Sequence, residues 1–398
     1  MTPNRLFSRI HHLLDRLGPL VALLFVWGLF AALEWQKFAS WTNTQSILLQ
    51  TAVVGVAALG ATMIIISGGI DLSVGSLIAL VSVVVAYVIT TVTGAFPSSI
   101  AYPNAVALLA SVVGVALAMV CGLAIGSMVI GHLGRVATAV AIGLGGLLAW
   151  RYGLSGWQGW TSLSVGAAIA VAAWWTDRKL SPPIVLSPFI VTLGMWGALR
   201  GIAKGLADNS AIYIPPDFDS KLSTFMLLPS AKVDASLLAR PWQWWSPGVW
   251  IFLVLAVLVA MLLRYTQFGR HIYAIGSNEQ TARLCGIQVE RTKLKVYMLA
   301  LALAGVAGVL HFSFNTMGDP NTATGYELQV IAAVVIGGAS LSGGVGGVLG
   351  AVAGALMMTM IDNGCTKVGL ENWMQEILTG GIIVAAVALD KLRHRAAT

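Results

Sequence analysis

The stretch LIALVSVVVAYVI, residues 77–89, contains no charged residue and could form most of a membrane-spanning helix. Similar runs recur along the 398 residues, of which 57% are hydrophobic and only 10% are charged. The mean hydropathy is +0.84, and soluble domains carry about 25% charged residues. Because a surface so poor in charge would not stay dissolved, the sequence predicts a polytopic helical membrane protein and excludes a soluble globular domain.

A bilayer core of roughly 30 Å requires about 20 apolar residues per helix. Candidate spans lie near 18–36, 45–66, 72–93, 104–131, 136–152, 161–176, 185–203, 247–264, 294–314, 326–342, 345–362 and 372–389. The predicted fold class is therefore all-α, a polytopic transmembrane helical bundle of about 12 spans. The span near 185–203 is the weakest, since Pro188 lies within it and Arg200 near its end. A full crossing and a broken or re-entrant helix both remain open there.

The positive charges indicate topology rather than a nucleic-acid partner. The net charge is +7, but the lysines and arginines are scattered between apolar runs instead of forming one basic surface. Most of them fall on the inner side if the N-terminus is cytoplasmic, as the positive-inside rule requires. Both termini are then expected in the cytoplasm, which an even number of spans allows. Residues 5–18 read as an amphipathic interfacial segment before an uncleaved first span.

Two loops stand out by length. The outer loop, 204–246, has balanced charges and ends in PWQWW, which fits an aromatic belt at the membrane interface. The cytoplasmic loop, 265–293, is basic and polar. Within it, Ser277 is a plausible N-cap for a short polar helix at 278–284, closed by Gly286. Two interpretations stay open, a solvated loop helix and a docking element for a soluble partner.

Asp71 is the most informative single residue, in the turn SGGIDLSVG at 67–75. A carboxylate near membrane depth is costly and usually faces a cavity, a partner or the interface. The flanking glycines let backbones approach closely or break the helix. Ser73 is a plausible cap for the next helix. Asp71 and Ser73 therefore either cap a helix at an inner turn or take part in translocation or gating.

Glu327 is a second acidic candidate, in GYEL at 325–328, where the start of an apolar helix favours an anion. Helix capping and a place along the pathway are both compatible with it. The pattern GGxxLSxG occurs at 68–75 and again at 337–344. This indicates a weak internal repeat of the kind found in transporters, with chance as the alternative in a chain of 44 glycines.

Several motifs of catalysis and cofactor binding are missing from the sequence. No G-x-x-x-x-G-K-[ST] motif is present to bind ATP phosphates. The three cysteines lack the spacing of a disulfide framework or a zinc site, and neither an H-x-x-x-H pair nor a nucleophile elbow occurs. No relay of several carboxylates and histidines lies within the spans. We therefore expect no catalytic residue, metal or cofactor, and a protein that is not an enzyme.

Four blocks of sequence, in order along the chain, resemble permease subunits of monosaccharide ABC importers of the ribose and xylose type. This family belongs to the branched-chain amino acid/sugar permease superfamily. The blocks are SGGIDLSVGS (67–76), PFIVTLGM (188–195) with Arg200 and Gly201, the segment 269–287, and GYEL (325–328) with IAAVVIGG (331–338). The resemblance implies one transmembrane permease domain over 1–398. Its parts are a core at 18–131 and 184–390 and a two-span insertion at 135–183 into a ten-span core.

The resemblance also implies a function. The chain would translocate a monosaccharide, most readily a pentose such as ribose or xylose, by alternating access driven by a separate ATPase that binds the ATP. The implied partners are a second permease chain forming a homodimer, two ABC ATPase domains on the cytoplasmic side, a periplasmic sugar-binding protein and membrane lipid. The implied location is the bacterial inner membrane.

The family's functional residues can be placed on this chain. The ATPase-coupling residues would be Asn278, Glu279, Ala282, Arg283, Gly286 and Ile287, within the loop 265–293. The pathway or gate residues would be Asp71, Ser73, Gly75, Tyr326 and Glu327. Gln329 departs from the pattern, since many relatives have an acid there. The alternatives are an ABC permease for a nucleoside, an autoinducer-type sugar or a branched-chain amino acid, and, less readily, a stand-alone secondary transporter.

Overall fold

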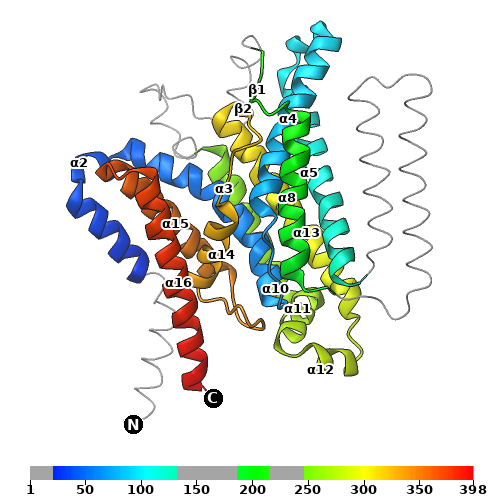
Figure 1. Cartoon of the computed structure of the whole chain (residues 1–398), viewed down its shortest axis with the longest axis vertical. Helices are drawn as coiled ribbons and strands as arrows, with labels where there is room; N and C mark the ends of the chain where they lie inside the picture. The colour runs from blue at the N-terminus through cyan, green and yellow to red at the C-terminus, as the bar shows by residue number, and fades with distance from the viewer. Residues whose placement is uncertain (1–20, 132–185, 216–245, 398) are drawn as a thin grey trace.

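The computed structural model describes residues 21–131, 186–215 and 246–397, and almost all of its elements are helices (Figure 1). They are a helix at Val21–Leu33, α2 (Trp35–Phe38), α3 (Trp41–Ile66), α4 (Val74–Ala95), η1 (Pro97–Ala101), α5 (Pro103–Val129), α8 (Pro188–Leu206), α10 (Pro247–Tyr265), α11 (Gln267–Ser277), α12 (Glu279–Leu284), α13 (Val289–Asn315), α14 (Tyr326–Ile336), α15 (Val348–Val368) and α16 (Asn372–Ala397). Two short strands, β1 (Ile212–Tyr213) and β2 (Met317–Gly318), pair antiparallel. The predicted all-α class is confirmed. The predicted spans near 136–152 and 161–176, and the segment 5–18, lie outside the described residues.

Six helices among the described residues are long and apolar enough to cross a bilayer: α3, α4, α5, α10, α13 and α15. Each coincides with a predicted span. Shorter apolar helices lie at Val21–Leu33 and Trp373–Ala385, where spans were also predicted. The chain is therefore a multi-pass membrane protein. The total of twelve spans stays a prediction.

Two helices differ from what the sequence indicated. Pro188 is the first residue of α8, where a missing N–H leaves no helical hydrogen bond unmade, so α8 runs unbroken to Leu206. The broken-helix alternative is wrong over this range. The span predicted at 326–342 is also wrong, because α14 ends at Ile336 and Gly338, at φ +92°, turns the chain. The 11 residues of α14 cover about 16 Å, half of a bilayer core.

α3 and α13 form the centre of the bundle. The most apolar windows of α3 and α13 are 89% and 78% buried, against 33% for α5 and α10, although all four have similar hydropathy. Because lipid and protein neighbours are equally apolar, small residues rather than hydrophobicity decide where helices meet. Gly60 of α3 lies against the backbone of Ala300 of α13, and Gly122 of α5 against the backbone of Tyr297.

The bundle has two distinct ends (Figure 1). α11 and α12 lie together at the lower end, which we call the α12 end, and α16 runs toward it. β1 and β2 lie at the upper end, which we call the β1 end. The segment that follows α14 runs toward the α12 end, and α14 itself covers only about half of a bilayer core. The first residue of α14 therefore lies about halfway between the two ends.

Candidate coupling segment and transport pathway

The candidate coupling segment is the pair of short helices α11 and α12. Asn278 separates them, and its side-chain oxygen accepts a hydrogen bond from the Thr281 N–H at 2.8 Å as the N-cap of α12. The predicted cap, Ser277, is wrong by one residue, because Ser277 is the last residue of α11. The predicted end is confirmed. Gly286 adopts φ +81°, and its N–H bonds to the Arg283 carbonyl.

Two predicted coupling residues anchor α12 instead of projecting from it. Ala282 is buried in a small apolar cluster with Ile275 of α11 and Val289 of α13, and Ile287 packs against the same cluster. These contacts fix α12 to the start of α13. A force applied to α12 is therefore transmitted to a central helix of the bundle.

Glu279 and Arg283 belong to a charge network between α12 and α13. The Glu279 carboxylate pairs with Arg283 at 3.2 Å and with Lys293 at 2.6 Å, and Arg283 also pairs with Glu290 at 3.1 Å. Partial burial alone would raise the pKa of the Glu279 carboxyl, but Lys293 and Arg283 outweigh that effect and hold it below its usual range. Both side chains stay partly exposed. They can therefore orient α12 and still contact a partner.

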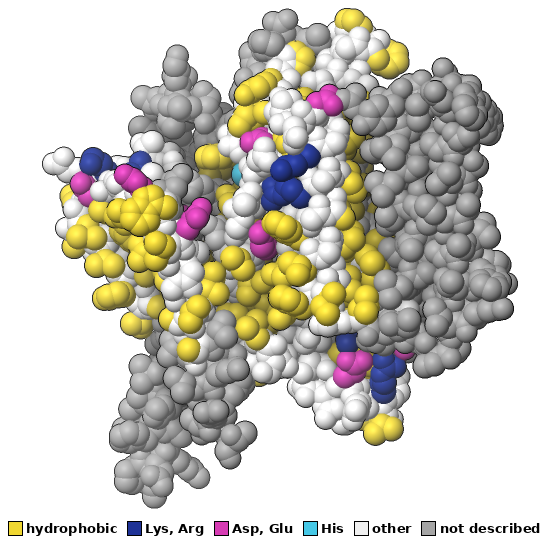
Figure 2. Space-filling model, viewed as in Figure 1, with side chains coloured by type: hydrophobic (Ala, Val, Ile, Leu, Met, Phe, Trp, Pro, Cys, Tyr) yellow, Lys and Arg dark blue, Asp and Glu magenta, His cyan; other side chains and the backbone are white. Residues whose placement is uncertain are grey.

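Leu284, the last residue of α12, was not predicted as a site residue. Its side chain is 89% exposed. Figure 2 shows an apolar side chain at the tip of the α12 end, beside charged ones. The leucine side chain therefore projects from the end of α12 with few contacts to the rest of the chain. The sequence did contain a signal for this residue, because Leu284 is an apolar residue at the end of an otherwise polar helix.

α11 rests on both turns of the predicted repeat. The Gly344 N–H donates to the Ile66 carbonyl at 2.8 Å and so joins the two turns. A Cβ at Gly276 of α11 would lie 1.7 Å from the Ile66 oxygen and 2.5 Å from the Gly344 nitrogen. The Tyr273 hydroxyl donates to the Gly346 carbonyl at 2.9 Å. The coupling segment therefore contacts both turns directly, mostly through backbone.

The two turns share geometry as well as sequence. In each, a glycine at positive φ, Gly68 or Gly338, donates its N–H three residues back, and the next N–H bonds five residues back. Further on, the side chains of Asp71 and Ser340 each accept the N–H two residues later. The distance along the chain from the glycine to the accepting side chain is one residue shorter in the second turn, Gly338 to Ser340, than in the first, Gly68 to Asp71. Such hydrogen bonds are common at helix ends, and the glycine at positive φ is the first of its pair at 68–69 but the second at 337–338, so the internal repeat stays a prediction.

Asp71 holds the start of α4. Its buried Oδ1 accepts hydrogen bonds from the Ser73 N–H at 2.8 Å and the Ser73 hydroxyl at 2.6 Å. The prediction that Ser73 caps α4 with its own side chain is therefore wrong, because that hydroxyl donates to Asp71. The other oxygen of Asp71 and the Tyr297 hydroxyl are buried without a partner among the described residues. Capping accounts for one carboxylate oxygen and leaves the second available.

Gly75 and Glu327, predicted from separate motifs, are in contact. A Cβ at Gly75 would lie 2.2 Å from Oε2 of Glu327. Glu327 lies in the first turn of α14, as predicted, but its Oε1 accepts a hydrogen bond from Nε1 of Trp196 in α8 at 3.2 Å. Tyr326 packs edge-on against His311, with ring centroids 5.8 Å apart. Glu327 therefore joins α4, α8 and α14.

Arg200 of α8 supports the loop between α13 and α14. Its buried guanidinium donates from Nη1 to the carbonyls of Pro320 at 2.9 Å and Thr322 at 2.6 Å. It also interacts electrostatically with Glu327 and Asp319. Further along α14, Nε2 of Gln329 donates to Oδ2 of Asp362 in α15 at 2.5 Å. Gln329, which was predicted to depart from the family pattern, therefore pairs its amide with a carboxylate.

These side chains form one group, which we call the polar cluster. Its members are Trp196, Arg200, His311, Asp319, Tyr326, Glu327, Gln329 and Asp362. Figure 2 shows several charged side chains on one face of the bundle, with a broad band of apolar side chains between them and the α12 end. Of the residues of the polar cluster, only Tyr326 and Glu327 were predicted as site residues; Trp196, Arg200 and Asp362 were among those that were not. An arginine and an aspartate inside apolar helices were signals for two of them, whereas nothing in the sequence marked Trp196.

Comparison with known proteins places the chain. It matches the family described as "Branched-chain amino acid transport system / permease component" over residues 130–387, well over half of the chain. The chain belongs to this permease family. The xylose transport system permease protein XylH of Haemophilus influenzae is 32% identical over 372 residues, 93% of this chain and 94% of that protein.

Two permeases of Escherichia coli K12 are similar to the same extent. The ribose import permease protein RbsC is 31% identical over 375 residues, 94% of this permease and 93% of that protein. The xylose transport system permease protein XylH is 32% identical over 381 residues, 94% and 90% of the two chains. No solved structure matches this permease.

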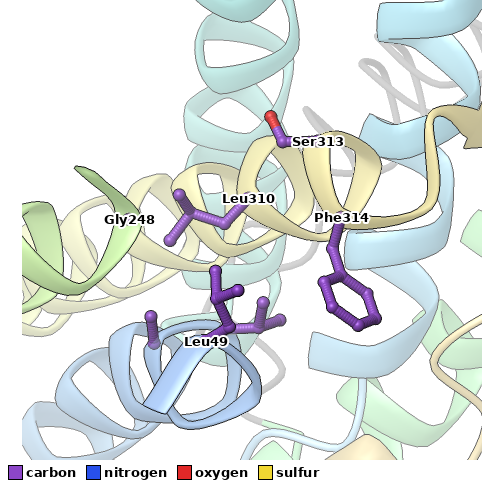
Figure 3. Close-up of a pocket in the computed structure, with 7 residues that line it drawn as sticks. Leu49, Gly248, Leu310, Ser313 and Phe314 are labelled. Atoms are coloured by element: carbon purple, nitrogen blue, oxygen red, sulfur yellow. The ribbon is translucent and has the colours of Figure 1, made fainter. Parts of the chain in front are cut away.

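A small pocket of this permease lies between α3, α10 and α13 (Figure 3). Leu49 and Leu310 point into it, and its volume of about 10 Å³ has room for roughly one water molecule. It is therefore not a solute site. The described residues contain no group of three or more side chains that could hold a metal ion. The acidic and imidazole side chains of the polar cluster have hydrogen-bond partners within the protein. Glu327 bonds Trp196, Asp362 bonds Gln329, and His311 bonds Thr322 and Asn315.

Proposed function

We propose that this permease is the membrane-spanning subunit of an ATP-binding-cassette importer for a monosaccharide, most readily a pentose such as ribose or xylose. The named relatives, similar over more than 90% of the chain, are xylose and ribose permeases. The observation that carries the proposal is the coupling segment. α12 is fixed to α13, and α11 rests on both repeat turns. In this proposal the chain catalyses no bond chemistry and binds no ATP, which its partner ATPase hydrolyses.

The proposed assembly with partner proteins is based on the two ends of the bundle and on the face that carries the polar cluster. In this proposal a second copy packs against the face that carries the polar cluster, so that the two clusters line a shared pathway. Two ATPase domains dock at the α12 end, in the cytoplasm, and a periplasmic sugar-binding protein delivers solute at the β1 end. The membrane is the bacterial inner membrane, with both termini in the cytoplasm. α16 runs toward the α12 end, as this orientation requires.

The mechanism is alternating access. Closure of the ATPases displaces α12, which cannot move alone because Ala282 and the charge network hold it to α13. α11 cannot move alone because Gly276 touches the backbone of both repeat turns. The displacement therefore tilts α13 and shifts the turns that support Asp71 and the end of α14. This links ATP hydrolysis to opening of the pathway at the α12 end.

Replacing Leu284 by aspartate is expected to weaken ATPase binding roughly tenfold or more, since burying a leucine in a partner's pocket contributes about 1.5–3 kcal/mol. The permease fold should be unaffected, because the side chain is 89% exposed. Titration of the detergent-solubilised permease with its ATPase measures the binding, and thermal unfolding checks the fold. Leu284→Met keeps an apolar side chain and should bind normally. Equal affinity of the aspartate variant and the wild type would remove Leu284 from the interface.

The double variant Glu279→Ala/Arg283→Ala is expected to lower coupled uptake several-fold while leaving the unfolding temperature nearly unchanged. Exposed ion pairs contribute about 0–1 kcal/mol each to stability, but here they set the angle between α12 and α13. Uptake and solute-stimulated ATP hydrolysis in proteoliposomes measure the effect. Arg291→Ala, whose exposed side chain bonds Gln288, is the matched control. If assembly and coupled uptake both stayed intact, the coupling assignment would be wrong.

The experiment that tests the function itself is reconstitution of the complete transporter. Uptake of D-ribose or D-xylose should require the ATPase, ATP and the binding protein together. A stand-alone secondary transporter would instead carry solute with the purified permease alone. A ligand screen on the partner binding protein separates pentoses from nucleosides, autoinducer-type sugars and branched-chain amino acids.

A further inference from the structure

The indole of Trp196 has an uncommon position for a membrane-embedded tryptophan. It lies in the middle of α8 rather than at an interface, and it is 37% exposed. The indole is therefore only partly covered by the protein, and part of its surface is open to contact.

The orientation of the ring is fixed. Its Nε1–H donates to Oε1 of Glu327 at 3.2 Å, and Glu327 in turn is packed against Gly75. Oε2 of Glu327 has no hydrogen-bond partner among the described residues, although it is buried. A buried carboxylate oxygen without a donor is costly, so a hydroxyl donor that reached it would be bound favourably.

We infer that Trp196 and Glu327 form a contact site for a sugar ring midway along the pathway. The inference rests on the proposed function and deepens it. A monosaccharide has a face of C–H groups and a rim of hydroxyls. The C–H face suits the electron-rich face of the indole, and a carboxylate, which only accepts hydrogen bonds, suits a hydroxyl donor.

The neighbouring charges favour a neutral polyol over an amino acid. An amino acid needs an accessible cation for its carboxylate. Arg200, the cation of the polar cluster, is buried; its Nη1 bonds two backbone carbonyls, and its Nη2 is enclosed without a hydrogen-bond partner among the described residues. Arg200 is therefore a positioning residue for the loop that borders the site.

The test compares aromatic and aliphatic replacements of Trp196 in the reconstituted transporter. Trp196→Phe keeps a ring but loses the N–H, whereas Trp196→Leu and Trp196→Met lose both. Stacking predicts that uptake of D-xylose or D-ribose, at saturating binding protein, falls about tenfold in the aliphatic variants and less than threefold in Trp196→Phe. Trp41→Leu, another exposed tryptophan, is the control and should transport normally.

Any other result of this test contradicts one specific part of the inference. Equal loss in the phenylalanine and aliphatic variants would mean that Trp196 acts through its hydrogen bond to Glu327, and the ring contact would be wrong. Normal sugar uptake by Trp196→Leu or Trp196→Met would remove the site altogether. Uptake of L-leucine instead of either sugar by the wild type would overturn the proposed substrate class, independently of the variants. Thermal unfolding and ATPase stimulation identify a variant that merely fails to assemble, in which case the other aliphatic variant decides.

Discussion

Replacement of Gly276 by alanine is expected to abolish coupled uptake. The new methyl group would lie 1.7 Å from the Ile66 oxygen and 2.5 Å from the Gly344 nitrogen, and both are backbone atoms that cannot rotate away. It would also intrude on the 2.8 Å hydrogen bond between these two residues. Overpacking together with a lost hydrogen bond costs about 2–4 kcal/mol. α11 would therefore separate from the repeat turns, and movement of α12 would no longer reach them.

The measurement is uptake in proteoliposomes, with ATP hydrolysis recorded in parallel. Loss of uptake with continued hydrolysis is the expected pattern, because Gly276 does not touch the exposed tip of α12. Gly347→Ala is the matched control in the adjacent loop, where no atom lies within 4 Å of the added Cβ. Wild-type uptake in Gly276→Ala would show that the contact between α11 and the turns carries no motion.

The second large effect is expected from Gly354→Ala in α15. A Cβ there would lie 1.8 Å from the Ala333 carbonyl oxygen and 2.7 Å from its carbon, so α14 and α15 must move apart. The free energy of unfolding should fall by about 2–4 kcal/mol. Uptake should fall as well, because α14 carries Tyr326 and Glu327 and its pairing with α15 includes the hydrogen bond from Gln329 to Asp362.

Thermal unfolding in detergent measures the stability change, and uptake measures the functional loss. Gly380→Ala in α16 is the control, since no atom lies within 4 Å of the added Cβ and alanine favours helix. An unchanged unfolding temperature in Gly354→Ala would mean that α14 and α15 pack less closely than the backbone contact indicates.

Hydropathy was sufficient to predict the long helices because length and apolarity are the whole requirement for crossing lipid. It could not predict where α14 stops. Apart from Leu341, residues 337–342 are small or weakly polar, and only the positive φ of Gly338 shows that the chain turns there. Nor could hydropathy separate the buried α3 from the more exposed α5, since protein and lipid neighbours select the same apolar side chains.

The candidate site was predicted in part. Gly75 and Glu327 were found separately, but their contact depends on how α4 and α14 pack, which no local pattern encodes. Ser73 and Ser277 were placed in the wrong roles because neighbouring side chains, Asp71 and Asn278, make the actual caps. Trp196 escaped because tryptophan in an apolar helix is ordinary until a partner such as Glu327 is known.

Arg200 holds the loop at 319–325 through the main-chain carbonyls of Pro320 and Thr322. Every residue type supplies such a carbonyl, so this support survives changes of side chain in the loop. Exposed positions such as Asn321 and Thr324 are therefore free to vary during evolution without loss of the architecture beneath them. The loop can therefore drift in sequence while keeping its shape, whereas Arg200 itself has little freedom to change.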